Sequence, residues 1–230
     1  MMALFEFPRA AAFGRILPKN KIYEHAAVGS KVKRCFVEEV DQVKWAYKLA
    51  PETVNLTGTP SVPEIQVIEV KLRGAALNHE ILQAIDRAIP FPSLFELIKP
   101  GERKLVAAYK RPSEVDTGKW VVSDYFESDW HPAGASRQAL PHTLDLRGLY
   151  ERLIKSLMPA TSVQDEALPE RVARIEAIRA KERDIARIKS RLAREKQFNK
   201  RIAINAELRV ATKDLKQLDG NIKSDTVKEI

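Results

Sequence analysis

The chain has 230 residues, of which 44% are apolar and 30% charged, a mixture that excludes an intrinsically disordered protein. A single cysteine, Cys35, excludes an intramolecular disulfide and indicates a cytoplasmic protein, and no apolar run approaches the roughly 18 residues of a membrane-spanning helix. The formal net charge of +8 favours an acidic partner, for which nucleic acid is the commonest choice.

The first half of the chain predicts one helix and two strands. Charged residues and Pro8 interrupt the apolar N-terminal stretch, so we expect no signal-peptide core there. Apolar residues recur at spacings of three and four in Ser30–Leu49, which predicts an amphipathic helix that Pro51 ends. Short strands are expected at Glu52–Leu56 and at Ile65–Leu72, where apolar and polar residues alternate.

The middle of the chain predicts two helices around three strands. Asn78–Ala88 is expected to be a helix with Asn78 as its N-cap, and Leu144–Met158 is expected to be another. Between them, the strands Ser93–Ile98 and Lys104–Lys110 flank a Pro-Gly turn, and Trp120–Phe126 follows. This order predicts an α+β fold in which residues 1–158 form one mixed sheet covered by helices.

The C-terminal segment carries the excess charge. Glu170–Leu218 holds 15 basic and 7 acidic residues, so the rest of the chain is neutral, and it contains neither glycine nor proline. We expect a linker at 159–169, a basic coiled-coil-like helix at 170–219 and a flexible tail at 220–230. Two apolar seams, Ile175–Leu192 and Leu208–Leu218, are out of register with each other, which indicates either a coiled coil with a stutter or a helical hairpin bent near Gln197–Arg201.

Glu69 and Lys71 are the nearest approach to a catalytic motif. A carboxylate and an ammonium two residues apart on a strand point to the same side, where they could hold a metal ion and polarise an attacking water. This geometry would suit a metal-dependent nuclease. Such an enzyme also needs an acidic ligand on the preceding strand. The residues of that predicted strand read Thr53-Val54-Asn55-Leu56 and include no aspartate or glutamate, so a solvated strand face is the simpler interpretation.

The remaining reactive residues favour structural roles. His79-Glu80 begins like a zinc-protease helix, but the second histidine position is Gln83, and the four histidines have no ligand spacing, so no metal site is expected. Cys35 lies beside the apolar face of its predicted helix and is expected to be a small buried residue. Asp129 and His131 could form an acid/base pair, although a strand edge closed by Trp130 is favoured. No phosphate-binding or dinucleotide-binding glycine motif occurs, so no cofactor is expected.

The basic helix is the strongest functional candidate. A rigid rod of lysines and arginines can neutralise several phosphates, and counterion release then favours binding to the backbone without reading base sequence. An acidic surface on a protein partner remains the competing interpretation, and a homodimer through the helix is a third. The predicted nucleic-acid-binding side chains are Arg187, Lys189, Arg191, Arg194, Lys196, Lys200 and Arg201.

Six blocks of the sequence form a recognisable set. They are Leu17–Tyr23, Lys31–Leu56, Glu64–Leu72, Ile85–Leu97, Asp129-Trp130 and Glu195–Arg209. In their order and spacing they resemble the bacterial "domain of unknown function 4391" family. The resemblance covers nearly the whole chain and supplies no catalytic residue. It implies an accessory protein of the kind encoded near DNA methyltransferases and helicases in restriction-like or anti-phage loci. We therefore expect a non-enzymatic accessory subunit that binds a larger helicase-type or methyltransferase-type subunit.

Overall fold

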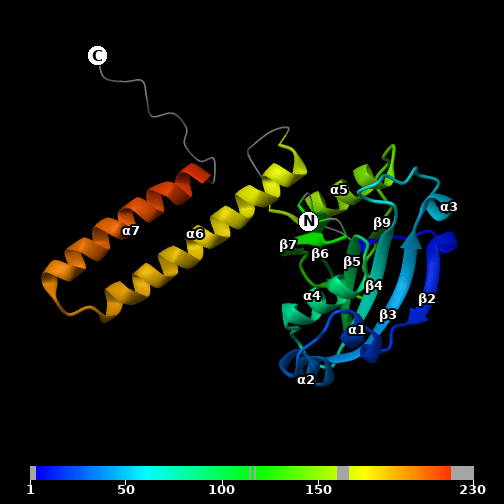
Figure 1. The fold of residues 1–230 in the computed structure, drawn as a ribbon, viewed down its shortest axis with the longest axis horizontal. Coiled ribbons are helices and arrows are strands. Elements are labelled where there is room, and N and C mark those ends of the chain that lie inside the picture. Colours follow the sequence, from blue (N-terminus) through cyan, green and yellow to red (C-terminus); the bar gives the residue numbers. More distant parts are fainter. Residues whose placement is uncertain (1–3, 114, 117, 160–165, 219–230) are drawn as a thin grey trace, which may run out of the picture. The chain divides into compact units, whose positions relative to one another are not determined.

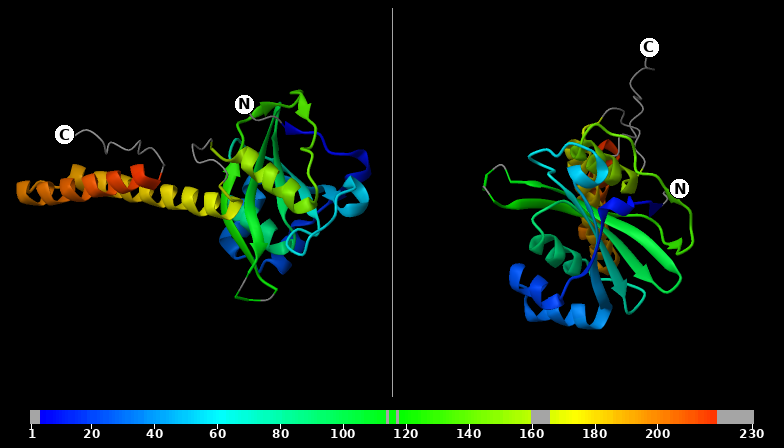
Figure 2. Two further views of the ribbon diagram at one scale, coloured as in Figure 1. Left: turned by 90° about the horizontal axis from the view of Figure 1, so that it is seen from above. Right: turned by 90° about the vertical axis from the view of Figure 1, so that its right-hand side faces the viewer.

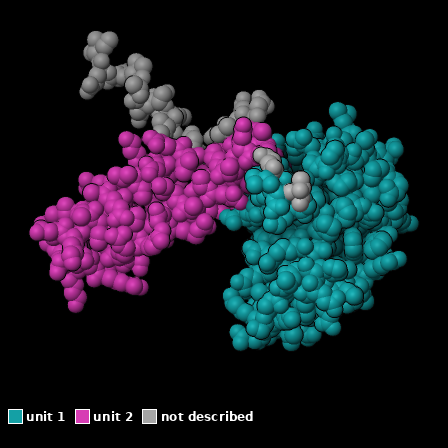
Figure 3. All heavy atoms as spheres, viewed as in Figure 1, with its two compact units in different colours: residues 1–159 teal, residues 160–230 magenta. Residues whose placement is uncertain are grey.

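The structure is a computed structural model that describes residues 4–113, 115–116, 118–159 and 166–218. The chain divides into two compact units, residues 1–159 and 160–230 (Figure 3). The first unit contains all the strands, and the second contains two long helices (Figure 1). The two units are described separately below.

The first unit is built on a mixed seven-stranded sheet with the order β2-β3-β4-β5-β6-β7, in which the short strand β8 also pairs with β6. β4 and β5 run parallel, and every other neighbouring pair is antiparallel. A parallel pair needs a crossover connection, which helix α4 provides. The strands are β2 (Ala12–Ile16), β3 (Val40–Leu49), β4 (Ile65–Leu72), β5 (Ser93–Lys99), β6 (Glu102–Pro112), β7 (Trp120–Glu127) and β8 (His131–Pro132).

Helices cover both faces of this sheet. On one face, α1 (Lys19–His25), α2 (Ser30–Glu39) and α4 (His79–Ala88) bury their apolar sides against β4, β5 and β6. Figure 2 shows α5 (Leu146–Leu157) on the opposite face. The expected mixed sheet covered by helices is therefore confirmed.

Several short elements escaped the sequence analysis. β1 (Leu4–Phe5) pairs in parallel with β9 (Arg137–Gln138), which joins the beginning of the described chain to a segment more than 130 residues later. The edge strand β2 and helix α1 were also missed, because their apolar residues are too few to give a periodic signal. A short 3-10 helix, η1 (Arg9–Ala11), completes the set.

Local sequence signals were correct where turn or cap chemistry fixes the backbone. The Asn78 side chain accepts a hydrogen bond from the backbone N–H of Glu80 and caps α4 as expected. At the β5–β6 turn, Gly101 has φ of 78°, the conformation that favours glycine after Pro100 in a tight turn. The strand predicted at Ile65–Leu72 and the helix predicted within Leu144–Met158 are likewise confirmed.

The helix predicted at Ser30–Leu49 is wrong in its second half. α2 ends at Glu39, and Val40–Leu49 is the strand β3, which lies between β2 and β4 in the sheet. The Lys19 ammonium donates hydrogen bonds to the carbonyls of Phe36 and Val40 and so takes up acceptors at the end of α2. Pairing on both edges of β3 then overrides the helical periodicity of its apolar residues.

The strand predicted at Glu52–Leu56 is also wrong. Pro51–Val54 forms the one-turn helix α3, with Pro51 at the first helical position, where its missing N–H costs nothing. Thr53 holds this turn through its hydroxyl, which accepts from the backbone N–H of Ala50 and donates to the carbonyl of Lys48.

The second unit is a helical hairpin rather than one continuous rod. α6 (Leu168–Arg194) and α7 (Phe198–Leu218) are antiparallel and joined by Glu195–Gln197 (Figure 1). This settles the alternative between a continuous coiled coil and a hairpin that the sequence left open. Residues 160–165 of the predicted linker, and the predicted tail at 220–230, lie outside the described residues.

Candidate functional site

An apolar seam and two ion pairs hold α6 against α7. The Lys181 ammonium lies 3.1 Å from the Asp214 carboxylate, and the Arg191 guanidinium lies 3.1 Å from Glu207. The two seams expected from sequence therefore pack on each other within one chain, on the surface that a coiled-coil dimer would use. The seam consists of Ile185, Ile188 and Leu192 of α6 with Ile204, Leu208, Ala211 and Leu215 of α7.

All seven predicted nucleic-acid-binding side chains are exposed, and all lie near the closed end of the hairpin. Two of them are in ion pairs, Arg187 with Asp184 and Arg191 with Glu207. The other five have no ion-pair partner among the described hairpin residues, 166–218. We call residues 187–201, which contain these seven cations and one carboxylate (Glu195), the hairpin tip.

The geometry of the tip concentrates positive charge on both helices and on their connection. Arg191, Arg194 and Lys200 line a shallow hollow between the end of α6 and the start of α7. The first turn of α7 contains no acidic residue, so the positive end of its helix dipole is not offset there. Like charges held this close repel each other, and a bound polyanion would relieve that repulsion.

The second candidate site, Glu69 and Lys71, lies on β4, and the structure corrects the sequence argument about it. The strand that precedes β4 is β3, not Glu52–Leu56, and it carries an acid at its start, Asp41. The Lys71 ammonium lies 3.0 Å from the Asp41 carboxylate. Its hydrogen bond to that carboxylate, followed by its positive charge, holds the pKa of Asp41 below its usual range. An acid on the preceding strand is therefore present after all.

Glu69 itself is engaged by cations. Its carboxylate lies 3.3 Å from the Lys44 ammonium and 3.8 Å from the Arg103 guanidinium. No group of three or more metal-ligating side chains occurs within the described parts of the chain. A metal ion at Glu69 would have to displace at least one of these two cations.

A buried glutamate next to Glu69 was missed from sequence. Glu96 on β5 lies beside Glu69 in the parallel β4–β5 register, and only 1% of its side chain is exposed. It accepts hydrogen bonds from Arg103 at 2.9 Å and from Arg137 at 2.5 Å. Arg137 comes from β9, so only the folded chain brings this pair together.

The other reactive residues have structural surroundings. Cys35 of α2 is buried in the core of the first unit, as expected. His79 pairs with Glu127 at 2.6 Å, and this hydrogen bond is the main reason that the pKa of Glu127 falls to about 2. Trp130 packs against the core with the Lys99 ammonium 4.1 Å from its ring centre, whereas no hydrogen bond joins Asp129 to His131 in the described structure.

A buried charge pair joins α4 to the centre of the sheet. Lys110 on β6 and Asp86 on α4 are 1% and 2% exposed, and the ammonium lies 3.6 Å from Asp86 Oδ1. The same ammonium donates to the backbone carbonyls of Asp86 and Ile89 at the end of α4. Tyr125 donates a 2.6 Å hydrogen bond to Asp86 Oδ2. The Lys110 ammonium and the Tyr125 hydroxyl both donate to groups inside the fold, which indicates a stabilising role.

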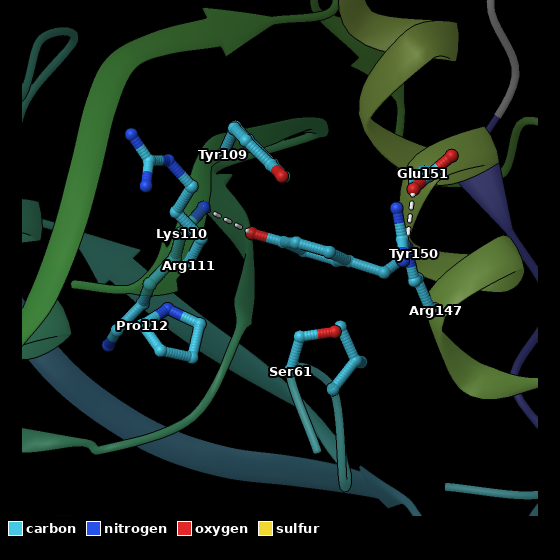
Figure 4. Close-up of a pocket in the computed structure, with 9 residues that line it drawn as sticks. Ser61, Tyr109, Lys110, Arg111, Pro112, Arg147, Tyr150 and Glu151 are labelled. Atoms are coloured by element: carbon cyan, nitrogen blue, oxygen red, sulfur yellow. Dashed lines mark hydrogen bonds and ion pairs between the residues drawn. The ribbon is translucent and has the colours of Figure 1, made fainter. Parts of the chain in front are cut away.

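A small hollow between β6 and α5 has the same character. Figure 4 shows Tyr150 reaching from α5 to the backbone of β6, where its hydroxyl accepts from the N–H of Lys110 at 3.0 Å. The same hydroxyl donates to the carbonyl of Ala108 at 2.6 Å, and burial raises the pKa of Tyr150. Arg147 and Glu151 form an ion pair at the rim. The Lys110 ammonium, which also borders this hollow, donates to two backbone carbonyls at the end of α4 and lies 3.6 Å from Asp86.

The chain matches a known protein family over most of its length. The model of a family described as domain of unknown function (DUF4391) matches residues 5–215. No curated protein and no solved structure matches the chain. Among the described residues, no helix is both long enough and apolar enough to cross a bilayer.

Proposed function

The chain belongs to the DUF4391 family, and on that basis we propose that it is a non-enzymatic accessory subunit of a DNA-processing or anti-phage assembly. In this proposal the hairpin tip binds the phosphate backbone of DNA. The first unit binds a larger subunit of the helicase or methyltransferase type. The resemblance to proteins encoded beside such enzymes suggests the assembly.

The proposal rests on one observation: five exposed cations of the tip have no ion-pair partner among the described residues of the hairpin. The other two tip cations, Arg187 and Arg191, each face a carboxylate, as Lys181 does outside the tip. Unpaired lysines and arginines on rigid helices keep their full charge for a ligand, and each phosphate contact releases condensed counterions. The tip offers only Phe198 for stacking, so contact with the backbone rather than with bases is expected.

Two charge-matched triple variants of the full-length protein test the proposal. The tip variant carries Arg194→Gln, Lys196→Gln and Lys200→Gln, whereas the control carries Arg209→Gln, Lys213→Gln and Lys216→Gln away from the tip. Each removes three positive charges from exposed positions. Binding of a labelled duplex is then measured by fluorescence anisotropy at several salt concentrations.

We expect the tip variant to lose affinity and the control to keep most of it. If all three residues contact phosphates, the slope of log K against log salt should become less steep by about 2.7 units in the tip variant. An equal loss in both variants would mean that only net charge attracts DNA. If the unaltered chain does not bind DNA at low salt, the tip serves another ligand.

A second candidate function, a metal-dependent nuclease, is favoured by the position of Asp41. Asp41, Glu69 and Lys71 come from adjacent strands, and the Asp41–Lys71 contact supplies the acid that the motif lacked in sequence. Magnesium is commonly held by one or two carboxylates together with substrate phosphates. The cations on Glu69 argue for a solvated ionic network instead, so this function ranks second.

Cleavage assays separate the two candidates. Supercoiled plasmid is incubated with the purified chain and with Mg²⁺ or Mn²⁺, alongside the Asp41→Ala and Lys71→Ala variants and a Glu102→Ala control. A nuclease would nick the plasmid only with metal and would lose at least 100-fold in rate in both variants but not in the control. Absence of metal-dependent nicking would remove this candidate.

A further inference from the structure

The outward face of α7 carries an exposed apolar stripe. Phe198, Ile202 and Val210 are 75%, 54% and 61% exposed, and Ala206 between them is also exposed. These four residues follow one another at steps of four, so each lies about 40° further round the helix than the last. A stripe about 120° wide is the kind of face that a helix normally buries.

This stripe is separate from the seam that holds the hairpin together. Ile204 and Ala211, which pack on α6, lie roughly 200° and 100° round the helix from Ile202 and Val210 respectively. α7 therefore has two apolar faces. One is covered by α6, and nothing among the described residues of the hairpin covers the other.

The charge beside the stripe has a single sign. Arg209, Lys213 and Lys216 are exposed on the same side of α7 and have no ion-pair partner in the described part of the hairpin. The two acids of α7, Glu207 and Asp214, are turned to α6, where they pair with Arg191 and Lys181. A surface that pairs with this face would gain from apolar side chains flanked by carboxylates.

A second copy of the chain does not meet that requirement. Two α7 stripes paired in parallel would place Arg209, Lys213 and Lys216 of each copy against the same cations of the other. Each hairpin carries a net charge of +8 between residues 170 and 218, so the hairpins would repel each other along their length. Like charges flanking a helix–helix contact are a known means of excluding self-association.

We propose that the outward face of α7 docks an amphipathic helix of a partner protein whose apolar seam is flanked by acidic side chains. The stripe would enter the partner's seam, while Arg209, Lys213 and Lys216 would form ion pairs at its edge. This inference deepens the proposed function, because it rests on the accessory role and adds a partner-binding surface on the hairpin to the one proposed for the first unit. Apart from Phe198, the residues of this surface lie outside the hairpin tip.

A designed peptide supplies the probe. A labelled helix of four heptads has Leu at the a and d positions and Glu at e and g, where repulsion between glutamates prevents it from pairing with itself. A matched peptide has Lys at e and g. Binding of both peptides to the full-length chain is measured by anisotropy, and sedimentation equilibrium gives the oligomeric state of the chain alone.

The stripe variant carries Phe198→Ser, Ile202→Ser and Val210→Ser. Its matched control replaces three exposed apolar residues of the first unit, as Val37→Ser, Val115→Ser and Leu144→Ser. Circular dichroism checks that both remain folded. We expect the Glu peptide to bind at least 10-fold more tightly than the Lys peptide, the stripe variant to lose at least 10-fold in affinity for it, and the control to lose none.

Four outcomes would overturn the proposal. Equal binding of both peptides, or equal binding to the stripe variant, would remove the docking face. A dimer that the stripe variant dissociates would make a second copy the occupant. Binding that appears only after removal of residues 219–230 would make that segment the occupant. Failure of this proposal can be told apart from failure of the DNA proposal. The triple variant at Arg194, Lys196 and Lys200 should lose affinity for DNA and keep its affinity for the peptide.

Discussion

Replacing Lys110 by methionine should destabilise the first unit strongly. The substitution preserves most of the apolar length of the side chain but removes a charge that is 1% exposed. It leaves the buried Asp86 carboxylate without its ion-pair partner. The Oδ1 atom of Asp86 has no hydrogen-bond partner even in the unaltered protein. The carbonyls of Asp86 and Ile89 at the end of α4 also lose their donor. Removing one partner of a buried ion pair costs about 3–5 kcal/mol.

The loss of stability in the Lys110→Met variant should depend on pH. Burial raises the pKa of Asp86 above its ordinary value of 3.8, and the Lys110 charge opposes that rise. Without Lys110 the folded-state pKa rises further. A carboxyl with a raised pKa in the folded state binds its proton more tightly than the unfolded chain does, so stability is lost as the pH rises above the unfolded value. The difference in the free energy of unfolding between the unaltered protein and the Lys110→Met variant should therefore be larger at pH 8 than at pH 5.

Urea denaturation followed by tryptophan fluorescence provides the assay. Trp45, Trp120 and Trp130 all lie in the first unit, so the signal reports on that unit. The double variant Asp86→Asn with Lys110→Met removes both charges and should recover at least about 1 kcal/mol relative to Lys110→Met alone. A single-variant cost below about 1 kcal/mol, or a double variant as unstable as the sum of both single variants, would refute the reasoning.

Three further outcomes are expected. Glu96→Gln leaves two arginines facing a neutral side chain that is 1% exposed and should cost about 3 kcal/mol in urea denaturation, whereas the exposed Glu102→Gln should stay within about 0.5 kcal/mol. Glu127 has a pKa of about 2 against an ordinary 4.5, so its contribution is present above pH 4.5 and is lost as the pH falls through 2. Thermal melts should show Glu127→Gln about 1 kcal/mol less stable at pH 6 and equal to the unaltered protein near pH 2. Ile188→Ala removes a side chain that is 3% exposed in the hairpin seam and should cost about 2–4 kcal/mol, seen as lost helicity and faster trypsin cleavage in the hairpin.

The parts of the fold that could be predicted from sequence are those fixed by neighbouring residues. The Asn78 cap and the Pro-Gly turn act within three or four residues, so their signals survive without tertiary information. Val40–Leu49 failed because its apolar residues fit a helical period. What decides its structure is hydrogen bonding to β2 and β4, strands that lie far away in sequence.

The candidate sites divide in the same way. The hairpin tip could be found from sequence because a surplus of lysine and arginine in one segment is visible without knowing the fold. The Glu96–Arg137 pair could not, since its partners are 41 residues apart and neither belongs to a motif. Asp41 was overlooked as the neighbour of Lys71 for a related reason, because assigning it to a helix removed it from the preceding strand.

The antiparallel pairing of α6 and α7 also determines the order in which the hairpin can assemble. The ion pair nearest the connection, Arg191–Glu207, joins residues 16 apart, whereas Lys181–Asp214 joins residues 33 apart. Each doubling of loop length adds about 0.6 kcal/mol of closure entropy. The contacts between the two helices should therefore form first at the closed end of the hairpin and later at the open end. Substitutions near Leu192 and Ile204 should slow folding, whereas those near Lys181 and Asp214 should mainly speed unfolding.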